Sequence, residues 1–137
     1  MKKSTCKGCS KEFSYNPHQK KGIYCSNKCQ VKYQQKLYVD GWLKGEETGG
    51  TGFQLSRHVR HYLLECVDNK CSQCGWGEVN SHTGNVPLQI DHIDGNPHNH
   101  EPNNLRVLCP NCHSLTSTYG CHGKGRKGRR ALLTSGL

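Results

Sequence analysis

The sequence predicts a small α+β fold that lacks a large apolar core and is held together by its cysteines. The chain has 137 residues, and only 24 of them are Leu, Ile, Val or Phe. That share is below the roughly 20% under which a chain of high net charge is expected to stay disordered. Ten residues are Cys, and small domains with too little core are usually stabilised by disulfides or metal ions. Short segments of strand and helix periodicity follow one another along the chain.

The cysteine spacing predicts zinc ions rather than disulfides. No apolar segment follows the basic start of the chain, so we expect a cytoplasmic protein, in which thiols bind metals more often than they form disulfides. No stretch approaches 18 consecutive apolar residues, which predicts no membrane span. A secreted disulfide scaffold is the alternative. Eight cysteines form four close pairs: Cys6 and Cys9, Cys25 and Cys29, Cys71 and Cys74, and Cys109 and Cys112.

Positive charge is concentrated at the two ends of the chain. Residues 1–40 contain nine Lys and two acidic residues, whereas residues 121–137 contain five basic residues and no acidic ones. The middle, residues 41–120, has five basic and eight acidic residues, and the formal net charge of the chain is +9. Two zinc ions with four thiolates each would lower that charge to about +5. Basic ends around a mildly acidic centre favour nucleic acid as the partner, although basic tails often only improve solubility.

Residues 1–40 are expected to form an N-terminal zinc finger of treble-clef or ribbon-like type. After the first cysteine pair, aromatic residues alternate as on a short strand. Ser26 is suited to cap a helix over residues 27–39, with Cys29 in its first turns. Cys6, Cys9, Cys25 and Cys29 would bind the N-terminal zinc ion. A finger that contacts DNA and a purely structural finger both fit this pattern.

A glycine-rich linker or long loop is predicted over residues 41–54, with Trp42 as an anchor at one end. Residues 55–66 then have the periodicity of an amphipathic helix, whose apolar face we expect to bury Cys66 as a small hydrophobic residue. The polar face of that helix includes Arg57 and Arg60, which either contact phosphates or are simply solvated.

Residues 71–119 predict a strand, a loop, a returning strand and a helix. PLQIDHI reads as the first strand, LRVL as an antiparallel second strand, and PNCHSLTSTY as a helix with Pro110 in its first turn. Two cysteine pairs enclose this unit, so a zinc ion would tie the base of the hairpin to the start of the helix. The loop between the strands is polar, and we expect its His98 and His100 to be solvated rather than to contact phosphate.

The residues at the ends of these elements suit phosphodiester hydrolysis. That reaction needs a base near neutral pH, which His92 could supply, and a cation to neutralise charge on the phosphate. A carboxylate with an imidazole suits a divalent ion, and Asp91 and His113 offer that pair. Asn104, where the chain turns back into the second strand, can bond the loop backbone. Because adjacent strand residues point to opposite faces, Asp91 and His92 serve one site only if the strand twists or ends there.

At these residues the chain resembles the HNH endonucleases, a family with a ββα-metal fold that is named for a His, an Asn and a His. The resemblance rests on Asp91-His92, Asn104-Leu105 and Cys112-His113 within LQIDHIDGNPHNHEPNNLRVLCPNCHSLT. It extends over roughly residues 55–130, which are similar to small HNH proteins of phages and bacteria. The N-terminal finger is similar to one found at the front of some of them.

The resemblance implies a small, zinc-stabilised α+β protein, with a ββα-metal core preceded by a helix and an N-terminal zinc finger. His92 would be the general base, Asn104 (rather than its neighbour Asn103) the structural asparagine, and Asp91 and His113 the ligands of one catalytic divalent ion. Mg²⁺, Mn²⁺ and Ni²⁺ all suit such ligands. The family cleaves nucleic acid to leave 5′-phosphate and 3′-hydroxyl ends. A structural zinc ion would be bound by Cys71, Cys74, Cys109 and Cys112.

These expectations together predict a DNA endonuclease of a bacterial host cell, encoded by a phage. Two alternatives are a non-catalytic zinc-finger protein that binds nucleic acid, and a nuclease subunit that is active only with phage DNA-packaging proteins. The oligomeric state is left open. The predicted domains are the finger over 1–40, the linker over 41–54, the nuclease over 55–120 and a basic flexible tail over 121–137. The tail residues expected to contact DNA are Lys124, Arg126, Lys127, Arg129 and Arg130.

Overall fold

The computed structural model describes residues 1–119 and shows a small mixed α/β protein with two groups of four cysteines. The chain divides into two compact units, one over Met1–Glu47 and one that begins at Thr48. The basic tail expected to contact DNA lies outside the described residues. No helix in residues 1–119 is long and apolar enough to cross a membrane.

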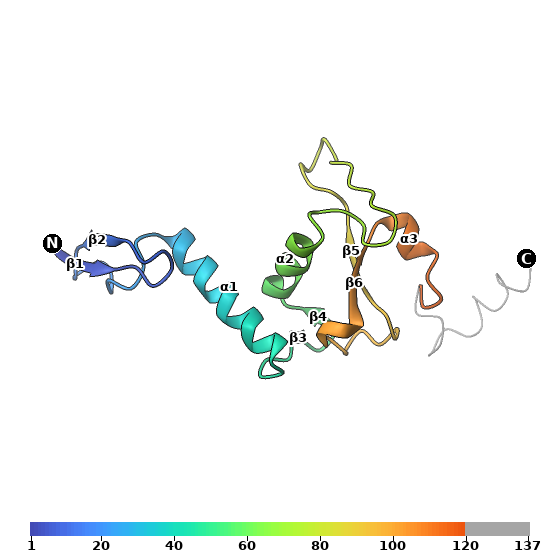
Figure 1. Cartoon of the computed structure of the whole chain (residues 1–137), viewed down its shortest axis with the longest axis horizontal. Coiled ribbons are helices and arrows are strands. Elements are labelled where there is room, and N and C mark those ends of the chain that lie inside the picture. Colours follow the sequence, from blue (N-terminus) through green and yellow to red (C-terminus); the bar gives the residue numbers. More distant parts are fainter. Residues whose placement is uncertain (120–137) are drawn as a thin grey trace, which may run out of the picture. The chain divides into compact units, whose positions relative to one another are not determined.

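The first unit consists of a hairpin and a long helix (Figure 1). Strand β1 (Lys2–Thr5) pairs antiparallel with β2 (Glu12–Tyr15). Strand β1 is made of polar residues only, so it has no apolar pattern by which the sequence would predict it. Helix α1 (Asn27–Leu43) begins after Ser26, whose hydroxyl accepts a hydrogen bond from the Cys29 N–H group, as expected for an N-cap.

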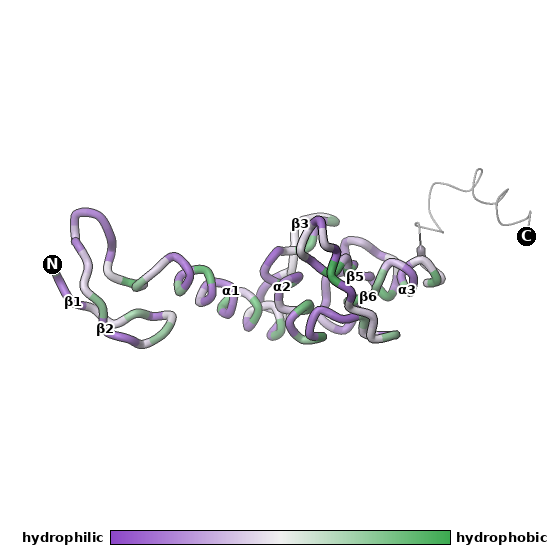
Figure 2. The backbone as a smooth tube through the Cα atoms, turned by 90° about the horizontal axis from the view of Figure 1, so that it is seen from above, coloured by the Kyte–Doolittle hydropathy of each residue, from purple (hydrophilic) through white to green (hydrophobic). Residues whose placement is uncertain are grey.

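Most of the surface of α1 is exposed to solvent. The helix extends four residues beyond the expected end at Val39, and its buried residues are Val39, Gly41 and Trp42, all near its C-terminal end. Hydrophilic residues predominate along the rest of it (Figure 2). An exposed row of lysines with a spacing of four runs along this part: Lys28, Lys32 and Lys36.

The second unit begins with a hairpin in a segment that the sequence predicted to be loop or linker. Strand β3 (Gly50–Thr51) pairs antiparallel with β4 (Gln54–Leu55). Two residues join the strands, and the first of them, Gly52, has a φ of +59°. Glycine adopts that conformation without a steric penalty, which suits it to a two-residue hairpin turn. Gly52, one of the glycines that suggested a linker, therefore forms part of a tight turn.

Helix α2 (Arg57–Cys66) begins two residues later than expected, because Ser56 caps it and the chain before it belongs to β4. The expectation that Cys66 is buried is wrong: its side chain is exposed. The apolar face of α2 instead buries Val59, and Leu63 and Leu64 pack against the core. Cys66 is the last helical residue, and the chain turns there so that Val67 rather than Cys66 meets the core.

The core of the second unit lies around a two-stranded hairpin and a short helix. Strand β5 (Gln89–His92) pairs antiparallel with β6 (Leu105–Leu108), a 3-10 turn (Pro102–Asn104) precedes β6, and α3 (Pro110–Ser114) follows it. Helices α2 and α3 lie on either side of the hairpin in Figure 1. Helix α3 is five residues shorter than the expected helix over 110–119. The buried core consists half of cysteine: Cys71, Leu88, Val107, Leu108, Cys109 and Cys112.

Candidate functional site

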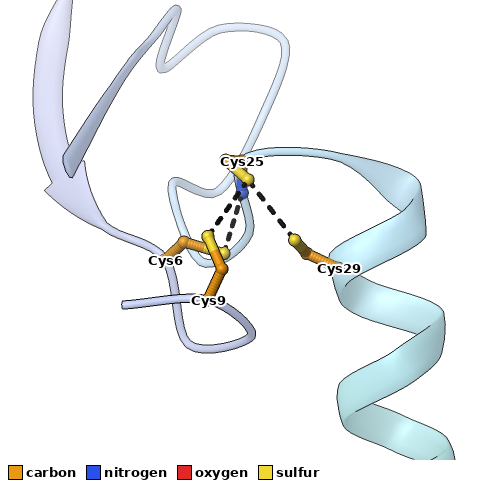
Figure 3. Close-up of side chains that lie close together, drawn as sticks. All are labelled: Cys6, Cys9, Cys25 and Cys29. Carbon is orange, nitrogen blue, oxygen red and sulfur yellow. Dashed lines mark hydrogen bonds between the residues drawn. The ribbon is translucent and has the colours of Figure 1, made fainter. Parts of the chain in front are cut away.

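The eight paired cysteines form two clusters, as their spacing predicts. In each cluster the four sulfur atoms lie within 4.8 Å of one another. The Cys25 sulfur is 3.7 Å from that of Cys9 and 3.5 Å from that of Cys29 (Figure 3). In the second cluster the sulfurs of Cys74 and Cys109 are 3.7 Å apart. Sulfurs bound tetrahedrally at about 2.3 Å from a zinc ion are about 3.8 Å apart, so both clusters have nearly the spacing of a zinc site with four cysteine ligands.

The first cysteine pair of each cluster lies in the same type of turn. The Cys6 N–H group donates to the carbonyl of Lys11, and the Cys71 N–H group donates to the carbonyl of Trp76. In both turns the residue after the second cysteine donates back to the carbonyl of the first cysteine. That residue has a positive φ in both turns, +63° at Ser10 and +80° at Gly75.

The electrostatics of the sulfurs fit a cation that binds thiolates. A hydrogen bond with Cys109 raises the pKa of Cys112 to about 12. Burial opposes ionisation of Cys71, but backbone N–H groups donate to its sulfur and together lower its pKa to about 6. Thiol and thiolate would therefore share a metal-free cluster, whereas Zn²⁺ replaces the protons and neutralises several thiolates at once. Each group of four cysteines could hold a structural zinc ion.

Asp91, on β5, contacts both β6 and α3. Its side chain is 5% exposed, and its Oδ2 accepts a hydrogen bond of 2.7 Å from Nε of Arg106, the residue directly opposite on β6. Its Oδ1 lies 3.5 Å from Nδ1 of His113. That nitrogen is buried and has no hydrogen-bond partner. The ring of His113 packs edge-on against Tyr119, with 5.3 Å between the centroids.

The unpartnered His113 nitrogen shows where a divalent ion would fit. A buried ring nitrogen without a partner is unusual, because burial removes its hydrogen bond to water. Oxygen and nitrogen atoms that are 3.5 Å apart can bind one ion at about 2.0–2.2 Å each. The arrangement thus offers Asp91 Oδ1 and His113 Nδ1 as two ligand atoms, while Arg106 occupies the other carboxylate oxygen. The four-cysteine groups are the sites with three or more ligands found in residues 1–119.

His92 is the last residue of β5, and it does not bond to Asp91 or His113. Its Nε2 lies 3.1 Å from Nδ1 of His100, whose own Nε2 lies 2.8 Å from the carbonyl oxygen of Gly52. Burial and the neighbouring His100 lower the pKa of His92 below its ordinary value of 6.5, against the opposing charges of Asp94 and Asp91. At pH 7 the neutral form of the His92 imidazole therefore predominates.

The expectation that His100 is solvated is wrong, because this side chain is only 4% exposed. Its neighbour in the same loop, His98, is exposed as expected. The difference arises from the hairpin of β3 and β4, which lies against the loop and offers the Gly52 carbonyl to His100. The contact joins residues 48 positions apart, so no local pattern could predict it.

Asn104 is buried, and its side-chain hydrogen bonds hold two parts of the loop between β5 and β6 together. Its side-chain amide donates to Asp94 Oδ1 at 3.0 Å and to the Asn99 carbonyl at 2.9 Å, and its Oδ1 accepts from the Asp94 N–H group. Hydrogen bonds from the Asn99 side chain, the Asn96 N–H group and Asn104 lower the pKa of Asp94. Asn103 is exposed.

The two basic residues of α2 that were expected to contact DNA have different surroundings. Arg57 is exposed. Arg60 is also exposed, but its guanidinium donates to the carbonyl of Leu88 at 3.2 Å, so it joins α2 to the chain before β5. Sequence reasoning missed Arg106 and His100 as parts of the candidate site. The pairing of LRVL with QIDH would have placed Arg106 opposite Asp91, whereas nothing local indicates His100.

Comparison with known proteins gives one informative match. No family model matches the chain, and no solved structure matches it. A curated relative, the H-N-H endonuclease F-TflIV of Escherichia phage T5, is 39% identical over 72 residues. The match covers 50% of this chain and 30% of the phage protein, so the chain spans less than a third of that relative's length. The resemblance to HNH endonucleases that the sequence predicts is therefore confirmed over half of the chain.

Proposed function

We propose that the second unit is a metal-dependent DNA endonuclease of the HNH type, with β5, β6 and α3 as its ββα-metal core. The proposal rests on the pair formed by Asp91 Oδ1 and the buried, unpartnered Nδ1 of His113, 3.5 Å apart, and on His92, which follows Asp91 on β5. The similarity to a phage endonuclease supports it.

His92 would act as the general base. A neutral imidazole accepts a proton from water, and the resulting hydroxide attacks the phosphorus in line with the departing 3′ oxygen. The P–O3′ bond breaks to leave a 5′-phosphate, and the 3′ oxygen takes a proton from a solvent water to become the 3′-hydroxyl. Asp91 and His113 would hold Mg²⁺, Mn²⁺ or Ni²⁺, which supplies neutralisation of charge on the phosphate and the leaving oxygen. Asn104 would keep the loop between the strands in one shape, since its amide bonds Asp94 at the start of that loop and Asn99 in its middle.

Arg106 is suited to orient Asp91 for this task. Its 2.7 Å hydrogen bond holds Oδ2, which leaves Oδ1 directed toward His113. Outer partners of this kind fix the orientation of a metal ligand. The same ion pair also keeps the buried carboxylate from being unpaired when no ion is bound.

DNA is the substrate that the charge distribution favours. The row of Lys28, Lys32 and Lys36 on α1 is exposed, and the end of the helix that contains it has no buried residue. Lysines with a spacing of four lie on one face of a helix, where they can contact successive phosphates. Arg57 on α2 adds an exposed positive charge in the second unit.

A non-catalytic nucleic-acid-binding protein is the second candidate. The observation that favours it is the ion pair of Asp91 with Arg106, because it gives the buried carboxylate a purely structural use. A subunit that cuts only within a packaging assembly would have the same residues, but it would be inactive alone.

Incubation of the zinc-loaded chain with supercoiled plasmid tests the proposed function. Nicked or linear DNA should form with Mg²⁺, Mn²⁺ or Ni²⁺ and not without added divalent ion. The His92→Ala variant should lose about 10²- to 10⁴-fold in rate, since that is the usual contribution of a general base. Its zinc content should match that of the wild type, and it should still unfold cooperatively, at a somewhat lower temperature because the hydrogen bond from His92 to the buried His100 is lost.

The His61→Ala variant is the matched control. His61 is exposed on α2 and pairs with Glu65, at a distance of 2.8 Å, on a helix with no proposed catalytic residue. It should cut at the wild-type rate. A His92→Ala protein that cuts as fast as the wild type would refute the assignment of the base, and a wild type that binds but never cuts DNA would favour the non-catalytic candidate.

A further inference from the structure

A second buried imidazole connects His92 to a distant turn. His100 lies between His92 Nε2, at 3.1 Å from its Nδ1, and the Gly52 carbonyl, at 2.8 Å from its Nε2. The rings of His92 and His100 are 5.2 Å apart between centroids. The three groups thus form a continuous chain of hydrogen bonds from the turn between β3 and β4 to the end of β5.

The chain of hydrogen bonds determines which ring nitrogens hold protons. A carbonyl oxygen only accepts, so His100 Nε2 is the donor to Gly52. In a neutral His100 the other nitrogen, Nδ1, then has the lone pair and accepts from His92 Nε2. His92 is therefore protonated on Nε2, and its basic atom is Nδ1. Within residues 1–119 no group forms a hydrogen bond with Nδ1, and this atom is not fully buried. Solvent can therefore reach it.

The surroundings hold His100 in this position. The side chain is 4% exposed, and a Cβ atom on Gly50 would lie 2.9 Å from its ring. Strand β3 can therefore approach the ring this closely only with glycine at position 50. Phe53, in the same turn as Gly52, packs edge-on against His98, so the turn contacts the loop at two points.

We propose that His100 is a positioning residue, which holds His92 in one orientation and in the tautomer with its lone pair on Nδ1. The proposal rests on the proposed function, in which His92 is the general base. With its Nε2–H held by His100, His92 keeps its lone pair on Nδ1, the atom that would take the proton from water. His100 acts through this hydrogen bond and would not itself contact the substrate.

Plasmid nicking by three variants at position 100 tests this role. His100→Ala and His100→Phe should lower kcat about 10- to 100-fold with KM little changed, because a misdirected base affects the chemical step. His100→Gln should recover part of the rate, since one amide can both accept from His92 and donate to Gly52. His61→Ala, on α2 and outside this chain of hydrogen bonds, is again the control and should cut at the wild-type rate. A His100→Phe variant as active as the wild type would show that position 100 only fills space, and would overturn the proposal.

A tautomer measurement separates this proposal from the proposed function. In zinc-loaded chain labelled with ¹⁵N-histidine, long-range ¹H–¹⁵N spectra show which nitrogen of each ring is protonated, and His92→Ala identifies the His92 signals. We expect His92 protonated on Nε2 in the wild type and a mixture of tautomers in His100→Ala. A His92 protonated on Nδ1, or unchanged in His100→Ala, would overturn the role of His100 whether or not the chain cuts DNA. A wild type with the expected tautomer but no cleavage would count against the endonuclease alone.

Discussion

At the scale of single residues, the two cysteine turns differ in the residue that follows the second cysteine. This residue determines the backbone strain of each turn. Ser10 and Gly75 both follow the second cysteine of a turn with a positive φ. An L-residue pays roughly 1–2 kcal/mol in the left-handed region, whereas glycine does not. The first turn is therefore strained where the second is not.

Exchanging the two residues should shift stability in opposite directions. We expect Ser10→Gly to raise the free energy of unfolding of the first unit by about 0.5–1 kcal/mol, because relief of strain exceeds the added freedom of the unfolded chain. Gly75→Ser should lower that of the second unit by about 1 kcal/mol. Urea unfolding of the zinc-loaded chain measures both. Equal and small effects of the two substitutions would mean that the backbone of each turn relaxes to fit either residue.

The pair of Arg106 and Asp91 gives a second prediction at this scale. Arg106→Met leaves a nearly buried carboxylate without its partner, which should cost about 1–3 kcal/mol. If Asp91 and His113 hold a divalent ion, saturating Mn²⁺ should restore part of this loss, because the ion replaces the missing positive charge. Arg106→Lys is the milder variant. Unfolding measured with and without Mn²⁺ tests this expectation. A loss of stability that Mn²⁺ leaves unchanged would contradict an ion at Asp91.

At the scale of elements, the lysine row of α1 should contribute directly to DNA affinity. Changing Lys28, Lys32 and Lys36 together to Gln should reduce the dependence of log K on log salt by about 2–3, since each phosphate contact contributes about 0.9. A variant with Gln at three other exposed lysines, Lys2, Lys3 and Lys11, is matched in charge. The same reduction in both variants would show that only the net charge of the unit matters.

Elements with a strong local signal could be predicted from the sequence. The strand over QIDH, the return over LRVL and the helix that starts at Pro110 follow from apolar runs, turn residues and a proline in the first turn. The two cysteine clusters follow from spacing alone. Asp91 and His113 could also be selected from the sequence. Asp91 lies near the end of a predicted strand, and His113 directly follows Cys112, a predicted zinc ligand.

What could not be predicted depends on contacts between distant residues. Strand β3 consists of Gly50 and Thr51, and glycine favours a linker over a strand in any local reading. The burial of His100 depends on that strand and its turn. The predicted burial of Cys66 is wrong because Cys66 is the last residue of α2. Helix ends are the least certain part of a periodic pattern.

At the scale of the whole molecule, each zinc cluster should stabilise its own unit. Cys109→Ser should lower the zinc content from two ions to one and unfold the second unit, because metal binding supplies much of the folding free energy of a small domain. Cys9→Ser should remove the other ion and leave the second unit folded. Zinc analysis with circular dichroism measures both.

The exposed Cys66 provides the control for these substitutions. Since its side chain lies outside both clusters, Cys66→Ser should leave two zinc ions and the wild-type spectrum. A Cys109→Ser protein that stays folded with one zinc ion would refute the stabilising role of the second cluster.

Because Cys112 and His113 are neighbours on α3, the proposed cleavage would depend on the redox state of the second cysteine cluster. An oxidant that converts the thiols of the second cluster to disulfides would release their metal and free the first turn of α3. His113 would then lose its place beside Asp91. Peroxide treatment should therefore abolish cleavage, and a reductant added with fresh zinc should restore it.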